Sequence, residues 1–522
     1  MATVLPPPSK RVRREAQLPK ETNVVPTDIP AVQIQFRAAD SGALLPGMHR
    51  VPGGSTAKQL ELLLNTLLEK TDDPIPYSFT LAATGTPIAS DIYTDLLHPR
   101  VAGTEDVLTL EYVPQAVFRV QCVTRCSATM QGHGGTVLAL AFPPAPSATL
   151  VTASGDTTAR TWDTFTGTPT GVIAKHTKWV LCVACSPDGK IVATGAMDGV
   201  VRLYDLAASR AVGGAMTGHS KWITSLAFEP LHLLTAGAAG RLASASKDGT
   251  VRIWDLASRT TAQVLSGHTA CVTQVKWGGL GVIYTCSQDR TVKVWDARGD
   301  VITLIATLKA HAHWVNFAGL STDFVLKTGA YDPFARKSNA EEKEVLTDEA
   351  QRVCARERFN AASTSHGVLT ERVVTASDDQ TMYLWNLFPD GRVTSTLNAN
   401  PVARMMGHQK PINHVAFSAD GRLLASCGFD NAVKLWNGAT GAFLATLRGH
   451  VAPVYMCAWS ADSRLLASCS KDCTVKIWDV AKAKLHMDMP GHKDEVYTVD
   501  WSADGKVLAS GGRDKTVKLW RH

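Results

Sequence analysis

The sequence predicts a mainly β protein, in which an eight-bladed β-propeller follows a small α+β domain. A pattern recurs eight times along the chain, mostly at intervals of 42 or 43 residues. Within each copy, short segments alternate apolar and polar residues and are separated by Gly, Asp or Pro. Short strands at such regular spacing are typical of a propeller, in which each repeat forms one blade of four strands.

Each copy contains four landmark residues in a fixed order. A histidine comes first, then a Ser or Thr, then an aspartate four residues later and an aromatic six residues after that, as in His219, Ser244, Asp248 and Trp254. The eight histidines are His133, His176, His219, His268, His311, His408, His450 and His492.

These tetrads have a structural and a catalytic interpretation. Buried together, the four groups satisfy one another's hydrogen bonds, whereas a buried polar group without a partner costs about 1–3 kcal/mol. Asp, His and Ser also occur together in nucleophilic triads, but an enzyme needs one such site and this chain has eight sets. We therefore interpret the tetrads as structural and expect no catalytic residue.

The pairs that accompany the tetrads, such as Gly218-His219 and Trp254-Asp255, resemble the WD40 family over about residues 116–522. The last copy ends just after its third predicted strand, and a strand-like segment, 116–121, precedes the first histidine. We expect this segment to supply the missing outer strand, because closing the ring removes exposed sheet edges.

The first 30 residues form a polar tail that contains prolines and a basic cluster, Lys10, Arg11, Arg13 and Arg14. Such clusters are typical of nuclear-import signals or of tails that touch nucleic acid. The alternative is a solvated, disordered terminus.

Residues 31–114 are predicted to form a separate domain. Alternating segments at 32–36, 77–81 and 107–112 predict strands, and Arg50-Val-Pro indicates another after the first. Leucines at helical spacing predict a helix from Thr56 to Leu68. Two strands, a helix and further strands indicate a ubiquitin-like β-grasp fold.

Composition sets bounds on the class of protein. The 522 residues are 45% hydrophobic and 19% charged, with a net charge of +6, which permits contact with nucleic acid without requiring it. We find no apolar run of membrane-spanning length and no signal peptide, so we expect an intracellular, soluble protein whose eleven cysteines are reduced.

Three copies carry a tryptophan three residues after the tetrad histidine, next to a basic residue. The pairs are Lys178 and Trp179, Lys221 and Trp222, and His313 and Trp314. Aromatic and basic residues at the rim of a ring would form an interaction face for protein or single-stranded RNA. In the alternative interpretation, the indoles pack around the mouth of the channel.

The fifth copy contains an insertion at about 331–370, rich in charged residues, which we expect to be a helix or a disordered loop that projects from one face. Arg or Lys also stands two residues before the aromatic in seven copies. Because radial repetition spreads these residues around the ring, we expect their stems to cover apolar surface rather than to form an RNA track.

Segments along the whole chain resemble the Notchless family of ribosome-assembly factors. They include Leu5-Pro-Pro-Pro-Ser-Lys, Asp73-Pro-Ile-Pro-Tyr, the junction from Thr104 to Val120, Gly218-His-Ser-Lys-Trp-Ile and Asp488-Met-Pro-Gly-His. The resemblance implies a non-enzymatic factor on the pre-60S precursor of the large ribosomal subunit, in the nucleus and nucleolus. The resemblance also implies that the protein has no small-molecule substrate and no contact with membranes.

The same resemblance implies a partner, the dynein-like AAA ATPase Midasin, whose MIDAS domain binds the ubiquitin-like domain. The matching residue is Glu105, flanked by Thr104 and Asp106, and its carboxylate would complete the coordination of a Mg²⁺ ion held by the partner. Mg²⁺ prefers oxygen ligands and keeps open positions that a partner can fill. Asp106 is the alternative ligand. We expect no cofactor or metal bound by this chain alone.

Two other classes explain the ring. One is an adaptor that recruits substrates to a ubiquitin ligase, and the other is a signalling scaffold that resembles G-protein β subunits. Neither accounts for Glu105 or for the basic tail.

Overall fold

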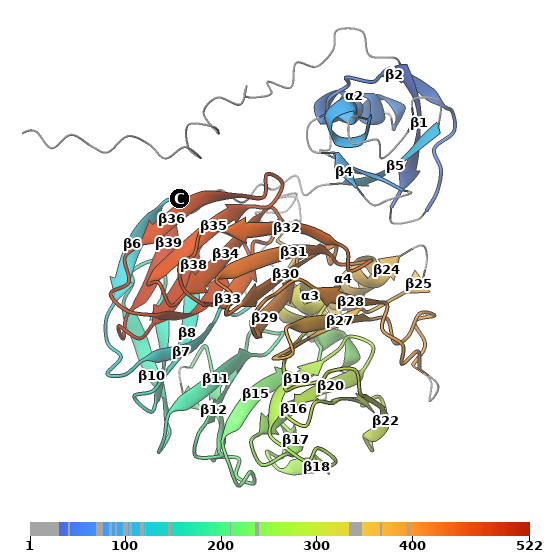
Figure 1. Cartoon of the computed structure of the whole chain (residues 1–522). Coiled ribbons are helices and arrows are strands. Elements are labelled where there is room, and N and C mark those ends of the chain that lie inside the picture. Colours follow the sequence, from blue (N-terminus) through green and yellow to red (C-terminus); the bar gives the residue numbers. More distant parts are fainter. Residues whose placement is uncertain are drawn as a thin grey trace, which may run out of the picture. The chain divides into compact units, whose positions relative to one another are not determined.

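The structure, a computed structural model, describes residues 31–39, 42–68, 77–82, 86–88, 91–97, 103, 107–114, 120, 122–144, 148–208, 210–234, 240–333, 347–365, 368–393 and 397–521. The chain divides into two compact units, Met1–Gln115 and Ala116–His522 (Figure 1).

The N-terminal unit is a five-stranded sheet with the order β2-β1-β5-β3-β4. Its strands are β1 (Ala31–Ala38), β2 (His49–Pro52), β3 (Tyr77–Leu81), β4 (Pro87–Ile88) and β5 (Val107–Pro114). β1 runs parallel to β5 and antiparallel to β2, as in a β-grasp fold, and so confirms that prediction.

Helix α2 (Ala57–Leu67) covers the apolar side of this sheet. The backbone N–H of Thr56 donates to the side-chain carbonyl of Gln59 at 2.9 Å and caps the first turn. Leu60 and Leu64 are buried against the strands, whereas Leu62 points to solvent. The sequence did not predict β4 or the single π-helical turn η1 (Tyr93–Leu97).

The second unit contains eight four-stranded antiparallel sheets, numbered here as blades 1–8 in the order of the tetrad histidines. The first strands of neighbouring blades contact one another all the way around and form a closed ring. These inner strands are β7 (Val137–Ala141), β11 (Val180–Cys185), β15 (Ile223–Phe228), β19 (Val272–Trp277), β23 (Val315–Leu320), β29 (Ile412–Phe417), β33 (Val454–Trp459) and β37 (Val496–Trp501).

The middle strands of the blades are almost entirely buried. The second strands are β8 (Thr149–Ser154), β12 (Ile191–Ala196), β16 (Arg241–Ser246), β20 (Val282–Ser287), β26 (Val373–Ser377), β30 (Leu423–Gly428), β34 (Leu465–Ser470) and β38 (Leu508–Gly512). The third strands are β9 (Thr158–Asp163), β13 (Val201–Asp205), β17 (Val251–Asp255), β21 (Val292–Asp296), β27 (Thr381–Trp385), β31 (Ala432–Asn437), β35 (Thr474–Asp479) and β39 (Val517–Arg521).

The outer strands vary most in length. They are β10 (Pro169–Lys175), β14 (Arg210–Ala211), β18 (Thr261–Leu265), β22 (Thr303–Leu308), β28 (Ala403–Met406), β32 (Phe443–Arg448), β36 (Lys484–Pro490) and, in blade 8, β6 (Arg125–Met130). Further elements lie between the first and second strands of two blades: in blade 3, η2 (Leu231–Leu233), and in blade 5, α3 (Asp323–Thr328), α4 (Asp348–Ser363), β24 (Thr364–Ser365) and β25 (Val368–Leu369).

Ring closure occurs as expected, but with a different strand. The outer strand of blade 8 is β6, whose Met130 pairs with Val517 of β39, and not the segment 116–121. Within that segment, the N–H of Val120 donates to Asp462 Oδ2 at 2.9 Å and the Val120 side chain is buried. The other blades give the physical reason, because each outer strand ends only a few residues before the next tetrad histidine. That offset places the closing strand just before His133.

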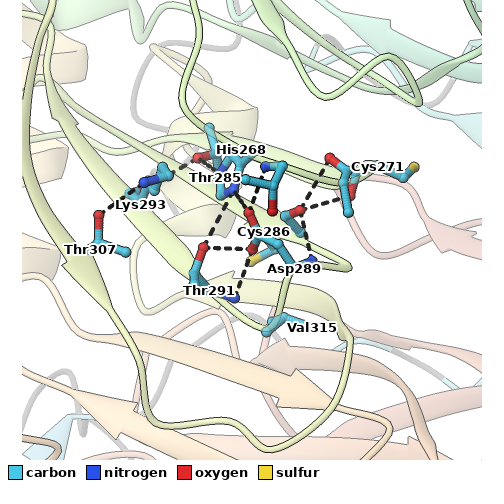
Figure 2. A network of polar contacts seen from close by, with 12 residues as sticks. His268, Cys271, Thr285, Cys286, Asp289, Thr291, Lys293, Thr307 and Val315 are labelled. Atoms are coloured by element: carbon cyan, nitrogen blue, oxygen red, sulfur yellow. Dashed lines mark hydrogen bonds and ion pairs between the residues drawn. The ribbon is translucent and has the colours of Figure 1, made fainter.

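The tetrads form as predicted, and blade 3 is representative. The Trp254 indole N–H donates to Ser244 Oγ at 2.8 Å, Ser244 Oγ lies 2.8 Å from His219 Nε2, and His219 Nδ1 lies 2.9 Å from Asp248 Oδ2. Figure 2 shows the same network in blade 4, around His268. Blade 2 has Tyr204 in place of tryptophan, so its network has no indole donor.

The hydrogen-bond order determines the protonation of these histidines. The hydroxyl of Ser244 accepts the indole N–H, so it donates its own hydrogen to His219 Nε2, and Nδ1–H donates to Asp248. Burial favours the neutral imidazole and lowers the pKa of His219 below its ordinary value of 6.5, against the opposing effect of Asp248. Burial alone would raise the pKa of Asp248, but hydrogen bonds from Thr250 and His219 outweigh it and lower that pKa to about 2.

We expect the stability of the ring to fall in two stages on acidification. A histidine whose pKa is lowered in the folded state makes its full contribution to the free energy of unfolding above about pH 6.5. That contribution is lost as the pH falls further. The aspartates contribute fully above about pH 4 and lose their contribution as the pH approaches 2. Urea-unfolding midpoints should therefore decline below about pH 6.5 and more steeply below about pH 4. A midpoint that stays constant down to about pH 4 would contradict the neutral imidazoles.

Candidate functional site

The ring has two faces with different connections. At the tetrad face, the chain enters each inner strand after a tetrad histidine, and the turn between the second and third strands carries the tetrad aspartate. At the insertion face, the inner strand connects to the second strand. The six residues of the predicted interaction face lie at the tetrad face, and the insertion of blade 5 lies at the opposite one.

All three predicted rim tryptophans are exposed. The side chains of Trp179, Trp222 and Trp314 are 54%, 39% and 45% accessible to solvent. Large aromatic side chains are normally more deeply buried, so this exposure favours an interaction face over packing around the channel mouth.

Two of these tryptophans belong to one patch, which we call the blade 2–3 patch and define as Thr157, Thr177, Lys178, Trp179, Met197, Lys221, Trp222 and Lys247. Trp179 packs over Gly155 of blade 1, where an added Cβ would lie 3.5 Å from the indole. Beside it is a hollow of about 300 Å³, lined by Thr157, Thr177, Lys178, Trp179 and Met197.

The blade 3 half of the patch is a cation–π pair. Lys247 Nζ lies 4.1 Å from the ring centroid of Trp222, and the Lys247 N–H donates to the Trp222 carbonyl at 2.9 Å. The backbone bond holds the lysine beside the ring, and the indole face attracts its charge. Repeat spacing alone identified Trp222. Lys247 was not predicted, because the position before the tetrad aspartate holds different types of residue in the eight copies and gives no repeat signal.

Trp314 lies apart from this patch. It enters blade 5, and blade 4 has Cys271 at the equivalent position, so the aromatic series is interrupted between Trp222 and Trp314. Its surroundings are also acidic, because His313 Nδ1 lies 3.6 Å from Asp378 Oδ2. The structure therefore divides the predicted face into the blade 2–3 patch and a separate site at His313 and Trp314.

Helix α3 crosses the end of the channel at the insertion face. Lys276 of blade 4 contacts Asp323 at 3.0 Å, and Lys327 contacts Asp500 of blade 8 at 2.5 Å. Blades 4 and 8 stand opposite each other in a ring of eight, so a six-residue helix that contacts both must span the channel. Phe324 also packs against the core of blades 7 and 8. The sequence did not predict that a helix would join these two blades.

Helix α4 continues this cover over blades 2–4. Phe359 is buried and stacks on His232 of blade 3, with ring centroids 4.4 Å apart, and Asp348 contacts Lys190 of blade 2 at 2.8 Å. Of the two expectations for the insertion, a helix is found, and it packs against the ring. The inserted part begins earlier than expected, directly after β23.

A buried carboxyl anchors the end of the insertion. Glu371 is fully buried, and its Oε1 accepts hydrogen bonds from Thr322 Oγ1 at 2.5 Å and from the Gly279 N–H of blade 4 at 2.9 Å. Burial raises the pKa of Glu371, against the lowering effect of these hydrogen bonds. The carboxyl thus joins α3 to the neighbouring blade.

The basic residues of the third strands do not form a surface track. Lys293, Lys476 and Lys518 are at least nine-tenths buried, and Lys476 contacts Asp488 of the outer strand at 2.6 Å. These three side chains are therefore enclosed within their blades and not aligned along an exposed track.

Several predicted residues lie outside the described part of the chain. These are Thr104, Glu105 and Asp106, and the basic residues Lys10, Arg11, Arg13 and Arg14. Gly103 is exposed on one side of the first group, and β5 begins at Val107 on the other. Among the described residues there is no cluster of metal-ligand side chains and no helix that is long and apolar enough to cross a membrane.

Two family models match the chain. The model "WD domain, G-beta repeat" matches residues 124–163, 167–205, 212–255, 259–296, 399–437, 441–479 and 483–521. None of these segments covers the first three strands of blade 5, where the insertion separates the first strand from the second. The model "NLE (NUC135) domain" matches residues 32–93 of the N-terminal unit.

Curated relatives match most of the chain. It is 50% identical to Ribosome assembly protein 4 of Saccharomyces cerevisiae over 457 residues, which cover 85% of each chain. It is 44% identical to Protein Notchless of Drosophila melanogaster over 374 residues, 72% of each chain. Among solved structures, the computationally designed Ika8 protein matches with a TM-score of 0.56 at 23% identity, covering 76% of this chain and 98% of that one, and shows the fold alone.

We expect Phe359→Ala to detach helix α4 while leaving the ring folded. The substitution removes a buried aromatic ring, which typically costs about 3–5 kcal/mol. Limited proteolysis should then cleave within residues 321–372 faster than in the unsubstituted protein. The matched control is Val353→Ala on the exposed side of the same helix, which should change the rate little. Equal rates for both variants would contradict the packing of α4.

Proposed function

Because this chain belongs to the family of Ribosome assembly protein 4 and Notchless, we propose that it is a non-enzymatic assembly factor of the large ribosomal subunit. The observation that carries the proposal is the 50% identity to Ribosome assembly protein 4 over 85% of both chains, which includes the N-terminal unit as well as the ring. A likeness confined to the repeats would support only a generic scaffold.

The structure of the ring supports a binding role. Its Asp, His and Ser or Thr side chains are used in eight internal hydrogen-bonded networks, with the hydroxyls fully buried. Three exposed tryptophans, Trp179, Trp222 and Trp314, lie at the tetrad face beside basic residues, where they are available to partners. We infer that the ring is a rigid platform on the pre-60S precursor, in contact with ribosomal RNA, ribosomal proteins or other assembly factors.

The N-terminal unit is proposed as the handle for a Midasin-type AAA ATPase. In this proposal Glu105 fills an open position of the Mg²⁺ ion in the MIDAS domain of the ATPase, between Thr104 and Asp106. Two observations support an accessible carboxylate there: Gly103 is exposed, and Val107, the first residue of β5, is 41% exposed. Lys10, Arg11, Arg13 and Arg14 would serve nuclear import, consistent with action in the nucleus and nucleolus.

Substitution at Glu105 tests the handle. Glu105→Ala removes the metal ligand, and Glu105→Asp shortens it by one methylene, so both should weaken capture by the isolated MIDAS domain in Mg²⁺ by roughly 30-fold or more. A chelator should abolish capture of the unsubstituted protein. Asp106→Asn is the matched control, which should retain binding. If Asp106→Asn weakens capture and Glu105→Ala does not, the ligand is Asp106.

Sedimentation tests the proposed role as a whole. In a sucrose gradient of nuclear extract, the protein should co-migrate with precursors of the large subunit, because a platform must stay bound while the particle matures. A pool that sediments only with light, ligase-associated fractions would indicate the adaptor function instead.

A further inference from the structure

We propose that the blade 2–3 patch binds unpaired RNA, with bases stacking on Trp179 and Trp222 and phosphates contacting Lys178, Lys221 and Lys247. This inference rests on the proposed function, since it assigns an RNA contact to a factor that works on a particle containing RNA. It specifies the ligand class, the residues and the face.

The two indoles are fixed platforms. Trp179 rests on Gly155 of blade 1, and Trp222 is held next to Lys247 by a backbone hydrogen bond. Both follow a tetrad histidine by three residues, so the buried networks of blades 2 and 3 fix the backbone from which they project. A rigid exposed indole loses little conformational entropy on binding, and every base presents a flat face to it.

The charge of the patch fits a polyanion. Lys178, Lys221 and Lys247 are exposed, and no ion pair to a carboxylate is found for any of them within the described part of the ring. The aspartates of these blades, Asp198 and Asp248, are turned inward, with side chains 8% and 11% exposed, and bind their own histidines. The positive charge of the lysines is therefore available to phosphates.

At blades 5, 7 and 8, carboxylates lie beside the exposed rings and basic side chains of the tetrad face. On blades 7 and 8, Glu495 accepts hydrogen bonds from Tyr455 and Tyr497 at 3.0 Å and lies 3.5 Å from Lys471 and 3.8 Å from Arg513. At blade 5, Asp378 stands beside His313 and Trp314. A phosphate chain is therefore favoured at blades 2 and 3.

Shape favours a single strand over a duplex or a threaded segment. In a duplex the bases are stacked inside and cannot lie on an indole, whereas unpaired bases can splay onto aromatic side chains. The hollow beside Trp179, about 300 Å³, is at the small end of ligand-pocket sizes and is open to the rim. Because α3 lies across the opposite end of the channel between blades 4 and 8, we place the strand along the rim.

The test uses the full-length protein and a fluorescein-labelled 12-nucleotide oligouridine in an anisotropy titration. We expect binding, and we expect Trp179→Ala and Trp222→Ala each to weaken it roughly 5- to 150-fold, the effect of losing one stacked base. Trp179→Phe should retain most of the affinity. Lys221→Ala should reduce the slope of log K against log salt by roughly 0.7.

Matched controls separate the patch from general surface effects. Phe165→Ala removes an aromatic that is 70% exposed on the insertion face, and Lys484→Ala removes an exposed lysine of an outer strand; neither should change affinity. Melting temperatures of all variants should match that of the unsubstituted protein, because every substituted side chain is at the surface. A blunt RNA duplex of the same length should bind more weakly than the single strand.

Three results would overturn the inference: no binding of the oligonucleotide, duplex binding as tight as single-strand binding, or equal effects of Phe165→Ala and Trp179→Ala. Capture of an acidic peptide in place of RNA would identify the patch as a protein-binding surface. Sedimentation keeps the two proposals distinct. Co-migration with large-subunit precursors without oligonucleotide binding refutes this inference alone, and oligonucleotide binding without co-migration refutes the assembly role.

Discussion

One buried hydroxyl in each blade connects the segments that make up the ring. On the second strand, Ser244 accepts a hydrogen bond from the third strand through Trp254 and donates to His219 at the entrance of the first strand. The Nδ1–H group of His219 in turn donates to Asp248, which lies in the turn between the second and third strands. Because the rim residues follow the histidine directly, the network that stabilises the blade also positions the side chains that partners would meet.

Much of the fold could be predicted because the same pattern of residues occurs eight times in the sequence. Fixed offsets identified all eight tetrads, and alternation identified the strands around them. The closing strand was misplaced because 116–121 looks like a strand in isolation, and only its distance from His133 distinguishes it from β6. β4 was missed because two residues, Pro87 and Ile88, carry no periodicity.

The candidate site was less predictable, because it depends on which blades become neighbours. The sequence shows three equivalent tryptophans, and the closed ring places Trp179 and Trp222 on neighbouring blades and Trp314 beyond an interruption at Cys271. The position of α3 depends on ion pairs to Lys276 and Asp500, which are far apart in the sequence. Neither pairing follows a local pattern. Glu105 remains a prediction from family resemblance.

The strand that closes the ring is also the one through which the N-terminal unit is covalently attached. Tension applied to that unit is therefore transmitted toward the place where β6, from the start of the ring, pairs with β39 at its end. Two residues that precede β6 are already attached to the ring. The Val120 N–H donates a hydrogen bond to Asp462, and Val123 is buried in the core shared by blades 7 and 8. The force is therefore shared by contacts with two blades before it reaches β6, which protects the pairing of β6 with β39 from being broken.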